Sequence, residues 1–74
     1  MFTIKVIDSY NGTINPSTDQ IVKSGESVKF RFVPKPDFVI DSVFIDNENI
    51  GAIDNYTFEN VTDNHSIYVR YINI

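Results

Sequence analysis

The sequence predicts an all-β protein: a small single-domain antiparallel β-sandwich or partly open barrel of about six or seven short strands. Eleven Ile, six Phe and four Tyr supply the β-branched and aromatic side chains that suit a half-buried pleated surface. The chain has one Ala and no Leu, and no stretch shows a helical period of useful length, so helices are not expected. Turn residues separate short alternating segments along its whole length.

The N-terminal part predicts two extended segments and a turn between them. Residues 2–8 form a strand in this prediction, because apolar and polar side chains alternate there with a period of two. Asn11 and Gly12 supply the positive φ that a tight hairpin turn requires. Residues 14–17 are extended, and Pro16 confines them to a sheet edge or a bend because proline has no N–H to donate.

The middle of the chain carries the clearest strand. Residues 19–23 are expected to form a short strand, and a Ser-Gly-Glu turn follows. Val28, Phe30 and Phe32 then alternate with charged side chains, which predicts a half-buried strand with the two phenylalanines in the core. Pro34 ends this strand because it cannot donate to a ladder.

The segment 38–46 is apolar but alternates imperfectly. Its apolar side chains share one face only if an extra residue is inserted, so a β-bulge is expected near Asp41 and Ser42. Residues 46–49 form a polar turn, and residues 56–58 form a further short strand. The last strand, residues 65–72, is predicted to bury three side chains, those of Ile67, Val69 and Tyr71.

Composition and charge exclude several classes of function. The 74 residues allow one domain, residues 1–74, with a formal net charge of -4. Cysteine is absent and histidine occurs once, which excludes disulfides, thiolate nucleophiles and two-histidine metal sites. A pI near 4.6 argues against nucleic-acid binding, and no apolar run approaches the roughly 18 residues of a membrane span. The start of the chain has neither the basic nor the apolar region of a signal peptide.

Several motifs in order resemble one known family. They are Gly12-x-Ile14-x-Pro16-Ser17, Val22-x-x-Gly25-x-Ser27, Phe30-x-Phe32-x-Pro34, Ile40-x-x-Val43-x-Ile45-Asp46, Ile50-Gly51 and a closing run from Tyr56 to Ile67. Together they look like a divergent internalin-B-type B-repeat module of bacterial surface and secreted proteins, whose repeats end in a "YTF-NVT-NH-I" pattern. The resemblance covers residues 12 to 71, and its closing motif is the most specific part.

The resemblance implies a small β-rich spacer or adhesive unit without enzymatic activity. It transfers no ligand-binding residue, because the shared positions are core and turn residues. The chain departs from the family pattern at three positions: Asp37 and Asn47 stand where glycine is common, and Phe38 stands where tyrosine is common. Asn tolerates left-handed backbone, so the change at Asn47 is mild, whereas Asp37 puts the loop before Phe38 in doubt.

Two groups of residues resemble sites of chemistry only weakly. His65 has Ser66, Thr62 and Asp63 beside it, but neighbours along one strand do not build a catalytic triad. The preferred interpretation is a turn histidine that hydrogen-bonds to the backbone. Oxygen atoms for calcium are offered by Asp46, Glu48, Asn49 and Asp54, yet their spacing matches no twelve-residue calcium loop. A solvated acidic hairpin is preferred, so no metal and no cofactor are expected.

Two further patterns have ordinary explanations. Lys29 and Arg31, with Lys23 on the expected neighbouring strand, form a small basic stripe that resembles some single-strand nucleic-acid binders. The acidic balance of the chain and the inward direction of the phenylalanines favour a solvated face instead. Asn-x-Ser/Thr triplets begin at four positions, and turn formation explains them better than glycosylation: Asn11, Asn55, Asn60 and Asn64.

The terminal strand carries the candidate interaction residues. Tyr68, Arg70, Ile72 and Ile74 lie on its outer side in this prediction, with Phe44 and Val33 beside them. Exposed aromatic and aliphatic side chains in a patch indicate a protein interface, and a second core layer is the alternative. Binding is expected through this outer face and through unpaired backbone at the strand edges of residues 2–8 and 66–74.

Two non-enzymatic functions are retained. The first is an accessory protein that decorates a bacteriophage head or tail, with capsid or tail proteins as partners and the virion as its location. It is preferred because the chain begins at Met1 without an export signal. The alternative is one spacer or adhesion repeat of a bacterial cell-surface or secreted protein, with neighbouring repeats as partners. Neither function involves nucleic acid, membrane insertion or a small-molecule substrate.

Overall fold

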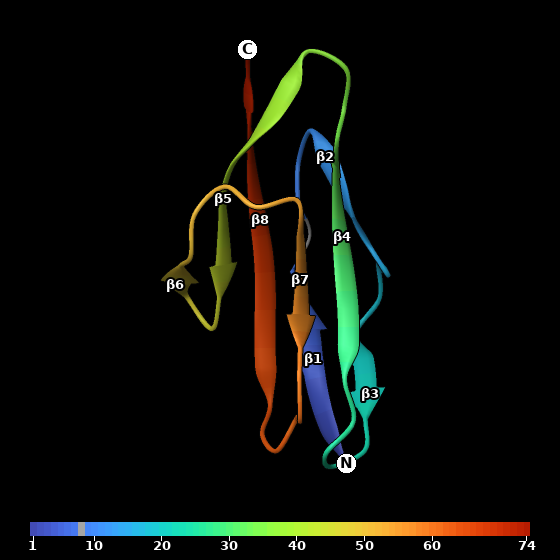
Figure 1. Cartoon of the computed structure of the whole chain (residues 1–74). Helices are drawn as coiled ribbons and strands as arrows, with labels where there is room; N and C mark the ends of the chain where they lie inside the picture. The colour runs from blue at the N-terminus through green and yellow to red at the C-terminus, as the bar shows by residue number, and fades with distance from the viewer. Residues whose placement is uncertain (8) are drawn as a thin grey trace.

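The computed structural model describes residues 1–7 and 9–74 and confirms the predicted all-β class (Figure 1). The described residues contain no helix. They contain eight strands, in chain order β1 (Phe2–Val6), β2 (Gly12–Asn15), β3 (Gln20–Val22), β4 (Val28–Pro34), β5 (Phe38–Ile45), β6 (Glu48–Asn49), β7 (Asn55–Phe58) and β8 (His65–Asn73). The extra strand is β6, whose two residues lie within the expected polar turn. Residue 8, the predicted end of the first strand, lies outside the described residues.

The strands form two sheets, which makes the fold a sandwich rather than a barrel. One sheet has the strand order β3-β1-β8-β5-β6, and the other has the order β2-β4-β7. All pairs are antiparallel except β1 and β8, which run parallel with Ile4 opposite His65. The first and last strands of the chain are therefore neighbours in the same sheet and run in the same direction.

The core lies between the two sheets. Phe30 and Phe32 are buried and their charged neighbours are exposed, so the predicted facing of β4 is confirmed. The rings of Phe30 and Phe58 pack edge to face with centroids 5.8 Å apart, a favourable aromatic geometry. The larger sheet contributes Ile4, Val22, Val43, Ile45, Ile67, Val69 and Tyr71 to this core. The three side chains predicted to be buried on the last strand are among them.

The irregularities of β5 also match the prediction. The register between β5 and β8 shifts between Ile40 and Ser42, which is the expected bulge. At the end of β5, Asp46 and Asn47 have φ values of 52° and 68°, as a tight hairpin with two left-handed residues requires. Asp37, the other position at which the resembled family commonly has glycine, has a φ of 71°.

The prediction of a tight hairpin at Asn11 and Gly12 is wrong, because the strands on either side of this turn do not pair. Asn11 does have a positive φ of 68°, but Gly12 does not, because it is the first residue of β2, and β1 and β2 belong to different sheets. β1 pairs instead with β3, and the Val6 N–H donates to the Asp19 carboxylate at 2.8 Å. The turn residues therefore carry the chain from one sheet to the other. β2 is an edge strand, as Pro16 predicted.

The molecule is elongated, with principal extents of 39 × 20 × 15 Å. Figure 1 shows the N-terminus at one end of the long axis and the C-terminus at the other. This arrangement follows from the parallel β1 and β8, because the chain enters and leaves along strands that run in the same direction.

Candidate functional site

Three of the predicted interaction residues lie on the outer face of the five-stranded sheet. Ile67, Val69 and Tyr71 of β8 are buried, so the alternating side chains of this strand point away from the core. These outward side chains include Tyr68, Arg70 and Ile72. Ile74 lies beyond the end of β8 and is exposed.

Neighbouring strands add apolar side chains to the same face. Phe44 of β5 pairs with Tyr68, and the two ring centroids are 5.9 Å apart. Val39 pairs with Ile72, and these side chains are 41% and 38% exposed. Ile7 follows β1 and is 37% exposed. We refer to Ile7, Val39, Phe44, Tyr68 and Ile72 together as the outer-face patch.

The outer-face patch has a hollow and an ion pair within it. The hollow is open and is lined by Ile7, Phe44, Asn47 and Tyr68. Arg70 lies between the two halves of the patch, and its Nε is 3.6 Å from a carboxylate oxygen of Asp41. Both members of this pair are partly exposed, so its electrostatic contribution to stability is small. A surface that combines apolar side chains with a balanced ion pair suits contact with a protein.

Two details of the predicted interface are wrong. Residues 66 and 67 are interior, because β8 lies between β1 and β5 there, whereas the pairing with β1 does not continue beyond Ile67 and the rest of the strand to Asn73 pairs with β5. The first strand is likewise interior, between β3 and β8. Val33 does not join Phe44 beside Tyr68, since it lies on β4 in the other sheet. The outermost strands of the five-stranded sheet are the short β3 and β6, and β6 pairs with β5 only at Phe44 and Ile45.

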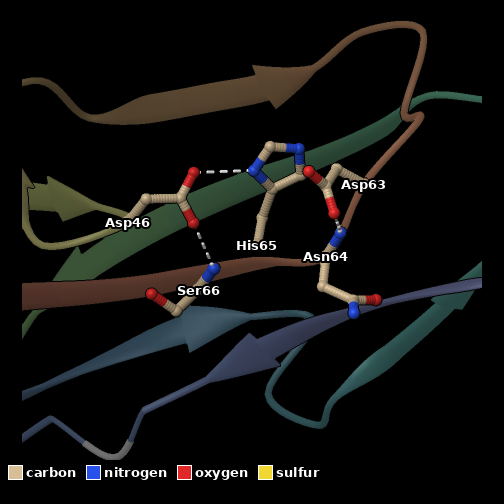
Figure 2. Close-up of polar contacts among 5 residues, drawn as sticks. All are labelled: Asp46, Asp63, Asn64, His65 and Ser66. Atoms are coloured by element: carbon tan, nitrogen blue, oxygen red, sulfur yellow. Dashed lines mark hydrogen bonds and ion pairs between the residues drawn. The ribbon is translucent and has the colours of Figure 1, made fainter.

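His65 holds the β5–β6 hairpin to the start of β8. Its Nδ1 lies 2.7 Å from Oδ2 of Asp46, and the other carboxylate oxygen accepts the N–H of Ser66 at 2.8 Å (Figure 2). The Ser66 side chain points away from the imidazole in Figure 2, so these residues form no triad. The predicted hydrogen bond of His65 to backbone is wrong, because its partner is a carboxylate. Its ring also packs against Phe58, with centroids 5.0 Å apart.

Three of the four residues considered for calcium make local hydrogen bonds. Asp46 is bound to His65 and Ser66, and the side chain of Asn49 accepts the N–H of Gly51 at 2.9 Å. Asp54 accepts a hydrogen bond from the amide of Asn55 at 2.7 Å. Within residues 1–7 and 9–74, no group of three or more His, Asp or Glu side chains is placed to hold a metal ion.

The basic stripe divides between the two sheets. Lys29 and Arg31 are exposed on the outer face of the three-stranded sheet, whereas Lys23 follows β3 in the other sheet. The prediction that Lys23 lies on a strand next to β4 is therefore wrong. Of the four asparagines that begin sequons, Asn11 and Asn60 have positive φ as turn residues do, whereas Asn55 begins β7.

The sequence predicted that the outer side of β8 carries interaction residues, but it did not predict most of the side chains that lie beside them. The contribution of Ile7 and Val39 to the outer-face patch was not expected, although both occupy outward positions of alternating segments. The signal for Val39 was hidden by the bulge, which inverts the facing of all residues before it. Ile7 required knowledge that the first and last strands are adjacent.

Comparisons with known proteins find no relative of this chain. No protein-family model matches the chain, and no curated protein or solved structure matches it. Among the described residues, no helix is long and apolar enough to span a membrane.

Proposed function

We propose that this chain is a non-enzymatic structural module that binds another protein through the outer-face patch. The observation that supports this most strongly is the patch itself. It carries aromatic and aliphatic side chains from β5, β8 and the end of β1, all on one face of one sheet. Exposed apolar patches that are contiguous and bordered by polar residues are typical of protein interfaces.

The proposed setting is an assembly in which the module is an accessory part. Decoration of a bacteriophage head or tail is one such setting, with capsid or tail proteins as partners. A spacer repeat of a bacterial surface protein, similar to a B-repeat, is the second. The positions of the two termini favour the second setting, because chain ends at opposite ends of the long axis allow modules to follow one another in a string (Figure 1).

The experiment replaces two side chains of the patch in the source organism or phage. The Tyr68→Ser, Ile72→Ser double variant keeps the buried face of β8 intact, so its circular dichroism should match the wild type. We expect the amount of the module that sediments with the assembled particles or the cell-surface fraction to fall at least tenfold.

The matched control is Val33→Ser. Val33 is exposed and apolar but lies on the outer face of the other sheet, so this variant should sediment as the wild type does. Equal recovery of the double variant and the control would reject the outer-face patch as the docking surface.

A further inference from the structure

We propose that the partner of the outer-face patch is a different protein, which places a carboxylate against Lys5 and Ser66 and an apolar side chain in the hollow beside them. This inference rests on the proposed function, because it takes the outer face of the five-stranded sheet as the docking surface. It adds the chemistry of the partner. Three features of this face support it: a cation without a counter-charge, a hydroxyl next to that cation, and the hollow.

Lys5 carries a positive charge that the described carboxylates do not balance. It lies opposite Ser66 in the parallel pair of β1 and β8, and both side chains are on the outer face because their neighbour Ile4 is buried. The Lys5 side chain is exposed, and it forms no ion pair with any of residues 1–7 and 9–74. Arg70, a second cation on this face, differs because its Nε lies 3.6 Å from a carboxylate oxygen of Asp41.

Acidic side chains on the two sides of Lys5 bind main-chain N–H groups instead. Asp19, which precedes β3, accepts the N–H of Val6 at 2.8 Å. Asp46, at the end of β5, accepts the N–H of Ser66 at 2.8 Å, and its other oxygen lies 2.7 Å from His65 (Figure 2). These two carboxylates are therefore engaged within the chain, and a carboxylate of a partner would supply the counter-charge of Lys5.

Ser66 and the hollow lie within reach of one partner segment. The Ser66 side chain is half-buried beside Lys5, and its hydroxyl can donate to the same carboxylate that the ammonium group holds. Ile7, two residues after Lys5, lines the hollow together with Phe44 and Tyr68. Two residues of a strand span about 7 Å. A partner surface on which an Asp or Glu lies beside an exposed apolar side chain therefore complements this part of the patch.

A second copy of this chain does not supply that chemistry. At the outward positions of the described strands, each copy carries Lys5 and Arg70 against Asp41, so two such faces would oppose like charges. Of the ten acidic residues, the described strands contain Asp41 and Glu48. Asp41 is paired with Arg70, and Glu48 lies opposite Ile45, whose side chain is in the core. Charge complementarity therefore favours a different protein with an acidic contact surface.

The first test adds a charge reversal to the co-sedimentation experiment. Lys5→Glu should lower the recovery of the module with the assembled particles or the cell-surface fraction by on the order of tenfold, because it sets like charges against each other. Lys29→Glu is the matched control, since it makes the same change in net charge on the outer face of the other sheet and should leave recovery unchanged. Both side chains are exposed, so the circular dichroism of both variants should match the wild type.

Salt separates the charged contact from the apolar contact. Lys5→Met removes the charge and keeps an apolar stem, so it should lower recovery at low ionic strength. This difference from the wild type should vanish at about 1 M salt, where the Debye length is about 3 Å. The loss caused by the Tyr68→Ser, Ile72→Ser double variant should persist at that salt concentration, because apolar contacts are not screened.

A carbodiimide cross-linker identifies the partner carboxylate. The reagent activates an Asp or Glu, the Lys5 amine attacks the activated carbonyl to form an amide, and the carbodiimide leaves as its urea, so groups in direct contact are joined. Mass spectrometry of cross-linked and digested wild-type particles should show Lys5 joined to an Asp or Glu of another protein. Lys5→Arg is the control, because it keeps the charge but lacks the amine. It should sediment with the particles and give no such product.

Contrary results reject this partner chemistry without deciding the proposed function. Equal recovery of Lys5→Glu and Lys29→Glu rejects the carboxylate contact, whereas the Tyr68 and Ile72 double variant remains the separate test of the patch as a docking surface. Cross-links from Lys5 that reach only carboxylates of this same chain overturn the choice of a different protein. A wild-type chain that is dimeric by sedimentation equilibrium overturns it as well.

Discussion

The ring of Tyr71 lies against the backbone of Gly12, across the interface between the two sheets. A Cβ atom built on Gly12 would lie 2.5 Å from ring carbons of Tyr71, closer than any side chain tolerates. The Tyr71 hydroxyl continues past this contact and donates a 2.6 Å hydrogen bond to the carbonyl of Thr13. One side chain of β8 thus joins the larger sheet to the edge strand β2.

This contact predicts that Gly12→Ala destabilises the domain. The added methyl group displaces either the rigid ring of Tyr71 or the backbone of β2, at a cost of about 1–3 kcal/mol in the free energy of unfolding. Urea denaturation measures the loss. In a Tyr71→Val background the same change should cost much less, and equal costs in both backgrounds would contradict this account.

The burial of Tyr71 predicts a stability that declines at alkaline pH. Burial raises the pKa of the Tyr71 hydroxyl above its ordinary value of 10.0, so the folded state holds the proton more tightly than the unfolded state does. The resulting stabilisation is complete below pH 10.0 and is lost as pH rises through the higher pKa of the folded state.

Denaturant midpoints measured from pH 8 to pH 11 test the alkaline decline. Tyr71→Phe should reduce this decline, and should also cost about 1 kcal/mol at neutral pH through the lost hydrogen bond to Thr13. Tyr10→Phe is the control, because Tyr10 is 81% exposed and should leave the pH profile unchanged. Identical profiles for wild type and Tyr71→Phe would exclude Tyr71 as the titrating group.

The facing of β4 predicts a large effect at Phe30. This side chain is fully buried and packs against Phe58, so Phe30→Ala should cost about 3–5 kcal/mol. A loss of this size is a large part of the stability of so small a domain. Calorimetry measures it, with Val33→Ala as an exposed control on the same strand that should change stability by less than about 0.5 kcal/mol. A Phe30→Ala melting temperature within a few degrees of wild type would mean that Phe30 contributes little to the core.

The turn before β5 predicts a stabilising substitution. Asp37 has a φ of 71°, a left-handed conformation that glycine adopts without steric cost. Asp37→Gly should therefore raise the free energy of unfolding by on the order of 0.5 kcal/mol, after the greater freedom of glycine in the unfolded chain is subtracted. Lys35→Gly, in the same loop but not at a positive φ, should instead lower stability. Destabilisation by both variants would show that relief of backbone strain is not the dominant effect at Asp37.

Features that depend on near neighbours along the chain are predictable from the sequence. Alternation placed Phe30 and Phe32 in the core, because successive side chains of a strand point to opposite faces. The broken alternation around Asp41 and Ser42 located the bulge for the same reason. Asn11 and Asn47 marked left-handed turns, since asparagine tolerates that conformation better than most residues.

The choice of neighbouring strands depends on how the whole chain packs. A period of two indicates which face of a strand is apolar but does not identify the strand's partner. For this reason the sequence wrongly predicted a hairpin after β1, and it wrongly placed Lys23 on a strand next to β4. The parallel pairing of β1 and β8 joins residues more than sixty positions apart, and closure of the common core, rather than any local signal, selects it. That pairing places the start of β8 between β1 and β5 and brings Ile7 beside Tyr68, which extends the outer-face patch across three strands.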